Sequence, residues 1–444
     1  MRTAQELVMW RSGAGAKSRL EVEGGLAGGD LTPVAAIYGA NASGKSTVLS
    51  ALDYVRSIIR RSAVMEPGVP LPTYPFLLDD SSLAEPFATE IKFRQEDRDY
   101  TYAFSLLDGV VDTEELRVNQ PTGGRRATRT LFRRSRDAAG RPHIKVSPYV
   151  PGHKRSLVEA TRDNTLFLSV AARDNHESLT GVYDWFRLTL SPIFTPDPRR
   201  WDECQFLTTQ RANRDPAFMA WLVEFLRRAD TGVGGVEFRL PDKLPPVDQL
   251  TFVQAEPDEP PIPNDPETLA RLRAAVIEQQ RRPKLSHLRS VGQPDLVTLP
   301  WAAESTGTMI LYSMAGQIDH ALSSGGVWLV DEIDSSLHPL LVRAVVSLFQ
   351  SSVTNPKGAQ IIFTTHDVSL LGNYGGDGFA LDRDQVWFTE KNAEGATELI
   401  ALSDYRPRGT ADTEKSYLLG RFGGLPLLSS WPGPPPAVPS GGGR

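Results

Sequence analysis

The sequence predicts an α/β protein in which a mixed β-sheet is joined to an antiparallel β subdomain and interrupted by a mostly helical insertion. Three observations support this fold class. A buried strand near the N-terminus runs through a glycine-rich turn into a helix. Apolar and polar residues alternate between residues 88 and 134, as in antiparallel strands. A second α/β region follows residue 284 and contains an apolar strand that ends in two carboxylates.

Length and composition restrict the class of protein. The chain has 444 residues, a net charge of −6 and a single cysteine, Cys204. One cysteine excludes an intrachain disulfide and a cysteine-cluster metal site. The charge gives no general argument for nucleic-acid binding. The N-terminus lacks the apolar core of a signal peptide, and no apolar run approaches the length of a membrane span, so we expect a cytoplasmic protein without membrane partners.

The chain divides into four predicted parts. Residues 1–155 form a first lobe with the glycine-rich turn and the antiparallel subdomain. Residues 156–283 form the mostly helical insertion, including a proline-rich linker over 241–266. Residues 284–430 form a second lobe, and 431–444 are a Pro/Gly-rich tail that we expect to be disordered.

The glycine-rich turn fits the phosphate-loop pattern G-x-x-x-x-G-K-[ST]. The strand Val34–Tyr38 precedes it and the helix Thr47–Val55 follows it, which is the context that this motif requires. Its amides and the helix N-terminus can hold phosphate, Lys45 can reach the β- and γ-phosphates, and the Ser46 hydroxyl can bind Mg²⁺. A chance glycine turn is the alternative. The predicted nucleotide-binding residues are Gly39, Ala40, Asn41, Ala42, Ser43, Gly44, Lys45, Ser46 and Thr47.

The N-terminal segment predicts a short hairpin that leads into the loop strand, with strands at Glu6–Trp10 and Leu20–Glu23. Arg11 lies in its turn and is either a nucleotide contact or an ordinary surface arginine. The prolines of Leu71–Leu78 exclude a helix there. The antiparallel strands that follow are Ala88–Arg94, Tyr100–Leu106, Val110–Val118 and Thr130–Arg134.

The hairpin around Gly123–Arg126 is basic, but no aromatic residues interleave with its arginines for base stacking. A solvated loop is therefore favoured over a nucleic-acid contact. Helical spacing marks the insertion at Leu166–Ala172, Leu179–Leu190, Phe218–Leu226 and Leu269–Val276. The second lobe is expected to contain the strands Leu285–Ser290, Asp295–Leu299, Gly326–Val330 and Gln360–Thr365, an edge strand at Gln385–Thr389, and the helices Thr306–Leu322 and Leu340–Phe349.

The second half of the predicted site begins where the strand Val327–Val330 ends in Asp331 and Glu332. In phosphate-loop proteins a carboxylate at the C-terminal end of a central parallel strand supports Mg²⁺. We assign this role to Asp331, and Glu332 can polarise the attacking water as general base. An apolar strand that ends in two acidic residues is common by itself. Its position downstream of a phosphate loop is what indicates a magnesium-binding role.

Two further segments carry candidate residues. The segment Glu304–Thr308 precedes a predicted helix, and Ser305 and Gly307 supply a hydroxyl and free backbone amides at its start. These groups can form an anion site, for which the same chain offers no anion. The alternative is an ordinary N-cap. His366 ends the strand after Asp331–Glu332 and can hydrogen-bond a γ-phosphate or orient water. A lone histidine is more often structural, and its position favours the functional role here.

In this order, the loop, Ser-x-Gly segment, Asp-Glu strand and strand-end histidine resemble the ABC-type ATPase head shared by Rad50, SMC and OLD proteins. More closely, the chain resembles the standalone AAA_15/AAA_21 ATP-binding proteins of bacterial abortive-infection and phage-defence loci, such as RloA/AbiLi. Further matching segments are Trp10–Ser12, Tyr74–Phe76, Asp331–Pro339, Asp384–Phe388 and Tyr417–Gly423. The segment Glu304–Thr308 differs from the Leu-Ser-Gly-Gly-Gln of transporters, which argues against a transporter subunit. The glutamine that follows the first helix in this type of head is not assigned, and Gln95 is left out of the predicted site.

The resemblance implies an ATPase that uses ATP and Mg²⁺ and forms a head-to-tail homodimer or a higher homo-oligomer. In the dimer, each ATP is held between the loop of one copy and Ser305/Gly307 of the other. The resemblance further implies a sensor or motor in phage defence, with an RloB-like effector encoded nearby. One alternative is a Rad50/OLD-like DNA-repair ATPase, although the sequence has no long coiled coil and no nuclease carboxylate cluster. The other is a nucleotide-gated scaffold with little turnover.

Overall fold

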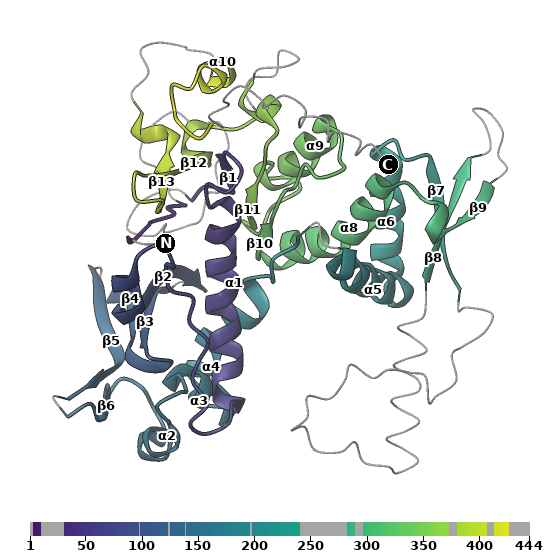
Figure 1. Cartoon of the computed structure of the whole chain (residues 1–444). Helices are drawn as coiled ribbons and strands as arrows, with labels where there is room; N and C mark the ends of the chain where they lie inside the picture. Colours follow the sequence, from purple (N-terminus) through teal and green to yellow (C-terminus); the bar gives the residue numbers. More distant parts are fainter. Residues whose placement is uncertain are drawn as a thin grey trace, which may run out of the picture.

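The computed structural model describes residues 3–9, 31–96, 98–122, 125–137, 139–195, 198–239, 282–288, 296–372, 380–405 and 413–425 (Figure 1). Within these ranges the chain forms one mixed sheet, one antiparallel sheet and a smaller three-stranded sheet, with helices between them. No helix in the described ranges has both the length and the apolar character needed to cross a lipid bilayer.

The phosphate loop follows β1, the middle strand of the mixed sheet, at that strand's C-terminal end. The strand order of this sheet is β10-β11-β1-β12-β13. Strands β10, β11, β1 and β12 run parallel to one another, and β13 is antiparallel to β12. The C-terminal ends of the four parallel strands therefore meet at the same edge. The bounds are β1 Val34–Gly39, β10 Val327–Val330, β11 Gln360–Thr364, β12 Val386–Lys391 and β13 Thr397–Ala401.

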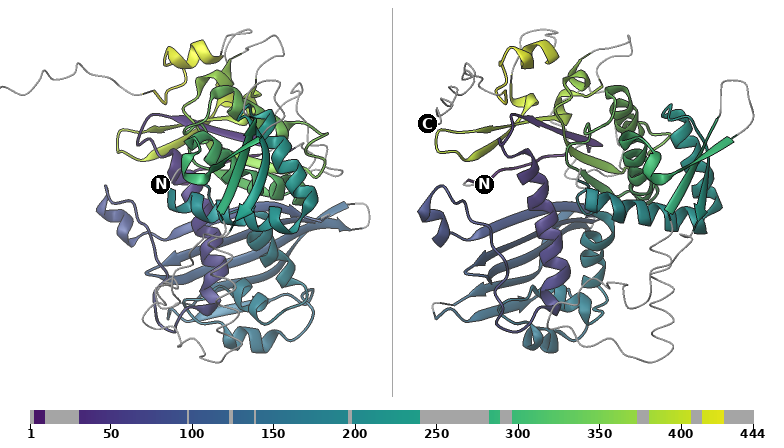
Figure 2. Two further views of the ribbon diagram at one scale, coloured as in Figure 1. Left: turned by 90° about the vertical axis from the view of Figure 1, so that its right-hand side faces the viewer. Right: turned by 45° about the vertical axis from the view of Figure 1, so that its right-hand side comes forward.

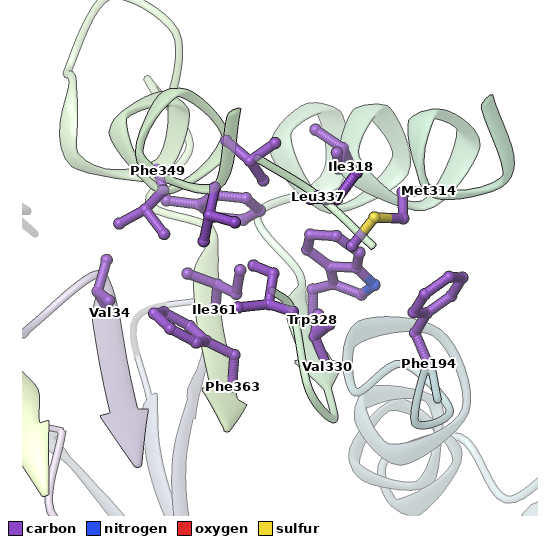
Figure 3. Packing of buried hydrophobic residues seen from close by; sticks show 14 of the residues in the cluster. Val34, Phe194, Met314, Ile318, Trp328, Val330, Leu337, Phe349, Ile361 and Phe363 are labelled. Carbon is purple, nitrogen blue, oxygen red and sulfur yellow. The ribbon is translucent and has the colours of Figure 1, made fainter. Parts of the chain in front are cut away.

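The two faces of this sheet are buried in different cores, because successive side chains of a strand point to opposite faces. In β1, Val34, Ala36 and Tyr38 pack into the first core, while Ala35 and Ile37 pack into the second. The first core lies under α8 (Thr306–Ser324) and α9 (Pro339–Gln350). Figure 3 shows this side, where the Trp328 ring packs near Met314 and Ile318.

The second core joins the mixed sheet to the antiparallel sheet through helix α1 (Lys45–Arg61), which starts at the phosphate loop and runs alongside both sheets (Figures 1 and 2). The antiparallel sheet is a meander in the order β2-β3-β4-β5-β6. Its bounds are β2 Phe87–Gln95, β3 Arg98–Leu107, β4 Val110–Thr122, β5 Arg125–Arg136 and β6 Pro142–Val146. Three short helices complete this core: α2 Lys154–Ala160, α3 Phe167–Arg173 and α4 Leu179–Asp184, the last continuing into a π-turn at Trp185–Thr189.

A third layer packs on the first core. Helices α5 (Pro198–Arg214) and α6 (Pro216–Arg228) lie against α8, and the small sheet β7-β8-β9 lies beside them (Figure 1). Its strands are β7 Val233–Arg239, β8 Arg282–Leu288 and β9 Leu296–Pro300. The described residues between 156 and 239 therefore contribute to both cores, and the division of the chain into lobes and an insertion stays a prediction.

The structure confirms most predicted elements and changes several. Residues Glu6–Met9 form no strand, so the predicted N-terminal hairpin is wrong in its described part; Leu20–Glu23, the helix Leu269–Val276 and the tail lie outside the described residues. Strand β12 is not an edge strand, because it pairs with β1 on one side and with β13 on the other. Strands β6, β7 and β13 and the helices α2, α5 and α10 (Thr413–Leu418) had no predicted counterpart.

Strand β10, which runs directly into Asp331 and Glu332, is not exposed at the end of the sheet. The segment Leu190–Phe194 runs along its outer side, with parallel bridges from Leu190 to Val327 and from Phe194 to Val330. The backbone carbonyl of Phe194 accepts a hydrogen bond from the Asp331 amide at 2.7 Å. This segment therefore holds the end of β10 from the side opposite β11.

A buried charged pair ties the antiparallel sheet to helix α3. Glu114 and Arg134 face each other across β4 and β5, and both side chains are fully buried. Glu114 accepts hydrogen bonds from Tyr102 Oη at 2.9 Å and from the first two amides of α3 at 2.7 and 3.0 Å. Arg134 donates to the Thr165 carbonyl at 2.6 Å. Burial raises the pKa of Glu114, and the nearby Arg134 opposes that rise.

Replacing one member of this pair leaves the other buried without its counter-charge. We expect Arg134→Met to lower the free energy of unfolding by about 3–5 kcal/mol, the size typical when a buried charge loses a nearby opposite charge. The matched control is Arg133→Met, one residue earlier on the same strand but exposed, which should change stability by less than about 0.5 kcal/mol. Chemical denaturation of both variants measures the difference. Equal losses would show that the pair does not stabilise the subdomain.

Candidate functional site

The phosphate loop connects β1 directly to α1. Gly44 has φ of 107° and caps the first turn of α1, and the non-glycine Ala42 has φ of 61°. Both values lie in the left-handed region, which favours glycine. A Cβ at Gly39 would collide with Thr389, and one at Gly44 would collide with Thr397. The two glycines of the motif are therefore required by the close approach of the β12–β13 hairpin as well as by the turn itself.

The Lys45 side chain is folded back over this loop. Its ammonium group donates hydrogen bonds to the carbonyls of Gly39 at 2.9 Å and Ala40 at 3.1 Å, and the residue is buried. Burial lowers the pKa of Lys45, while the carboxylates of Glu332, Asp331 and Asp334 act in the opposite direction and favour the charged form. The loop thus holds a cation beside three acidic groups.

A hydrogen-bonded junction joins the loop to the ends of β10 and β11. Oδ1 of Asp331 accepts from the Ser46 hydroxyl at 3.0 Å and from the Thr364 hydroxyl at 2.6 Å. The Glu332 amide donates to Thr364 Oγ1 at 2.7 Å. Ser46 and Asp331 are 285 positions apart in the sequence, so this contact exists only because the parallel strands end at the same edge.

Glu332 and His366 follow the two strand ends and are both exposed. Glu332 has φ of 49°, an uncommon backbone conformation for a residue with a Cβ, which costs free energy. The backbone amide of His366 donates to the Asp334 carboxylate at 3.2–3.3 Å. Asp334 therefore fixes the turn that carries Glu332 against the turn that carries His366.

Ser305 and Gly307 lie at the N-terminus of α8. Ser305 is exposed, and its hydroxyl accepts from the Thr308 amide at 3.1 Å as an N-cap. In the described part of the chain its hydrogen bonds stay within its own helical turn. A Cβ on Gly307 would lie 3.0 Å from the Ser336 carbonyl, so this helix end packs against the turn that follows Glu332. The N-cap interpretation is correct as local structure and leaves the helix end open to solvent.

The structure brings Lys45, Ser46, Asp331, Glu332 and His366 to one edge of the sheet. Thr47 is exposed in the first turn of α1. Arg11 lies outside the described residues. Gln95 ends strand β2 and donates to the Gly181 carbonyl at 2.8 Å, a contact within the second core.

Two residues of the junction were not predicted as site residues. Thr364 pairs in register beside the end of β10, since Val330 aligns with Phe363, and this alignment places its hydroxyl next to Asp331. Asp334 joins the two turns. The motif Asp-Glu-x-Asp and the Thr-Thr-His strand end contain both residues, but only the strand register shows that they meet.

The residues at this site fit a nucleoside triphosphate with Mg²⁺. A loop with no room for a Cβ at Gly39 and Gly44, a buried ammonium group and the start of a helix together suit a polyphosphate. A serine hydroxyl bonded to a carboxylate offers the hard oxygen ligands that Mg²⁺ prefers. The carboxylates around Lys45 supply further negative charge for a divalent cation.

Comparison with solved structures finds distant likeness. A crystal structure of an SMC head bound to the C-terminal winged-helix domain of ScpA has a TM-score of 0.31 and 14% identity, covering 84% of this chain and 91% of that one. The SMC head from Pyrococcus furiosus gives 0.28 and 13%, covering 84% and 92%, and that from Pyrococcus yayanosii gives 0.30 and 9%, covering 88% and 96%. Scores this low carry no weight beside a family match. No curated protein matches the sequence.

The family described as "AAA domain, putative AbiEii toxin, Type IV TA system" matches residues 34–372. This span begins at β1 and includes the phosphate loop, the helix that begins after Ser305, the Asp331–Glu332 strand end and His366. It covers more than half of the 444 residues. Together with the geometry of the loop and the acidic strand end, the match shows that this chain belongs to the AAA_21 family of P-loop ATPases.

Proposed function

We propose that this chain binds ATP with Mg²⁺ at the phosphate loop and hydrolyses it. The observation that carries the proposal is the junction in which Asp331 accepts hydrogen bonds from Ser46 and Thr364, beside the buried Lys45. A glycine cradle, an ammonium group and a hydroxyl–carboxylate pair suit a ligand that has both a polyphosphate and a divalent cation.

Each group has a distinct role in this proposal. The amides at the start of α1 and the Lys45 ammonium hold the phosphate oxygens, and Ser46 and Asp331 hold the metal ion. Bound Mg²⁺ neutralises the charge on the β- and γ-phosphates. Glu332 accepts the proton of the attacking water, and its exposed carboxylate can reach solvent. His366 donates a hydrogen bond to the γ-phosphate.

We further propose that two copies assemble head to tail, so that Ser305 and Gly307 of one copy face the phosphate loop of the other. Two features support this. The N-terminus of α8 carries partial positive charge, and Ser305 and Thr306 are exposed there. Gly307 also packs against Ser336, which follows Glu332, so a partner bound at this surface would contact the hydrolytic turn. Binding of ATP then favours closure, and hydrolysis releases it.

The proposed biological role is that of a sensor or motor in bacterial phage defence, acting with a separate effector protein. Support comes from the resemblance to abortive-infection ATPases and from the family description, which names an AbiEii toxin and a type IV TA system. The effector follows from the resemblance rather than from any surface of this chain.

Removing the lysine ammonium should abolish nucleotide binding. We expect Lys45→Ala to weaken ATP binding by about 100-fold or more, because at least one charge-assisted hydrogen bond to phosphate is lost together with its charge. Isothermal titration with ATP and Mg²⁺ measures the change. Lys92→Ala on strand β2, where the lysine is exposed, is the control and should bind as the wild type does. Unchanged affinity in Lys45→Ala would refute the loop assignment.

Replacing the general base should separate binding from hydrolysis. Glu332→Gln keeps the shape of the side chain but cannot accept the proton, so steady-state phosphate release should fall by about 100-fold or more while ATP still binds. Light scattering with size exclusion should then show an ATP-dependent dimer. Glu394→Gln, at the exposed β12–β13 turn, is the control. A monomer in saturating ATP would count against the shared-nucleotide arrangement.

The shared site can also be tested by mixing two inactive variants. Ser305→Arg should block the partner side of the site, and Lys45→Ala should block the loop side. A mixed dimer restores one intact site, so an equal mixture should regain about a quarter of wild-type ATPase activity. A mixture of Lys45→Ala with Lys45→Ala/Ser305→Arg is the control and should stay inactive. If the mixture of Lys45→Ala and Ser305→Arg also stays inactive, the two copies do not share their nucleotide sites as proposed.

A further inference from the structure

The β12–β13 hairpin supports the phosphate loop through two buried threonines that the proposed mechanism does not use. Thr389 lies on β12 directly beside Gly39 in the strand register, and its side chain is fully buried. Thr397 begins β13 and is also buried. Both residues follow the part of the chain that the family match covers, which ends at residue 372.

Thr389 holds the Ser43 side chain. Its hydroxyl donates to the Tyr38 carbonyl at 3.2 Å, which leaves its lone pairs to accept the Ser43 hydroxyl at 2.6 Å. Tyr38 is the residue before the first glycine of the loop. Thr389 therefore connects the last turn of the loop to the strand from which the loop begins.

Thr397 holds the Ser43 backbone. Its hydroxyl donates to the Ser43 carbonyl at 2.9 Å and accepts from the Lys391 ammonium at 3.0 Å. The peptide bond between Ser43 and Gly44 is trans, so its C=O and N–H point in opposite directions. A carbonyl that is fixed toward the hairpin turns the Gly44 amide away from the hairpin.

This peptide needs such a restraint. Ala42 and Gly44 both have left-handed backbone angles, and Ala42 carries a Cβ that makes this conformation unfavourable. The Ser43–Gly44 peptide lies between these two residues, and its rotation would relieve the strain unless the Ser43 carbonyl is held by a hydrogen bond. Within the described residues, the hydrogen bonds of Ser43 to Thr389 and Thr397 oppose that rotation at its side chain and at its carbonyl.

We propose that Thr397 and Thr389 are positioning residues for nucleotide binding: they orient the Ser43–Gly44 peptide so that the Gly44 amide faces the phosphate groups. This inference rests on the proposed function, because it assigns a role in binding the same triphosphate. It extends the site to a hairpin whose strand β12 lies on the opposite side of β1 from β11 and β10.

The test compares hydroxyl removal at the loop with hydroxyl removal elsewhere. Thr397→Val keeps the shape of the side chain but leaves the Ser43 carbonyl without its donor. We expect the Kd for ATP·Mg²⁺, and for Mg²⁺-pyrophosphate, to rise about tenfold, whereas Thr397→Ser should restore binding to within about twofold of wild type. The control is Thr209→Val on α5, a buried threonine bonded to the Gln205 carbonyl and to Tyr312.

A purely structural role would lower the Tm of Thr397→Val and Thr209→Val alike and leave both Kd values at the wild-type level; that result overturns the proposal. If Thr397→Val does not fold, Thr389→Val replaces it, with Thr389→Ser as its rescue and the same two outcomes. A wild-type protein that binds neither ATP nor pyrophosphate would instead refute the proposed function. The two failures are therefore distinguishable in one set of titrations.

Discussion

The site depends on one acceptor atom, Oδ1 of Asp331, which receives the Ser46 and Thr364 hydroxyls together. These two bonds hold the start of α1 and the ends of β10 and β11 in one place. The Phe194 carbonyl fixes the Asp331 amide from the other side. Asp331 is only half-buried, and the nearby Lys45 ammonium group donates its hydrogen bonds to the Gly39 and Ala40 carbonyls, so we expect the Asp331 carboxylate to be able to bind a metal ion. The rest of the candidate site is arranged around this junction.

The fold supports the junction by enclosing the sheet on both faces. Alternate residues of β1, β10 and β11 pack into different cores. A shift of any one strand by one residue would therefore move the side chains of the first core into the second core and those of the second core into the first. Helix α1 extends this constraint to the antiparallel subdomain, since the same helix begins at the phosphate loop and packs in the second core. The uncommon backbone angles of Ala42, Glu332 and Ser336 lie at the edge that this enclosure holds. Strain that is concentrated at a rigid edge is typical of functional sites.

Local sequence was sufficient for the motif-bearing parts of the site. The phosphate loop, the strand that ends in Asp331–Glu332 and the strand that ends before His366 all have strong local patterns. Pairing between distant strands was not predictable in the same way. Thr364 became a site residue through the register of β10 and β11, and β12 became an interior strand by pairing with β1. Strand β7 was missed because its paired glycines weaken the strand pattern, and β6 because it is short and begins with proline. The structure places Lys45, Ser46, Asp331, Glu332 and His366 at one edge of the sheet, but the roles assigned to them stay predictions, as do those of Ser305, Gly307 and Arg11.

We propose that the Asp331 junction is the magnesium and triphosphate site and that a second copy completes it. A crystal structure of the Glu332→Gln protein grown with ATP and Mg²⁺ tests both parts together. We expect a metal ion bound to Ser46 Oγ at about 2.0–2.1 Å, with Asp331 beside it and with Ser305 of a second copy at the γ-phosphate. A nucleotide bound elsewhere, or a γ-phosphate that contacts only its own chain, would contradict it.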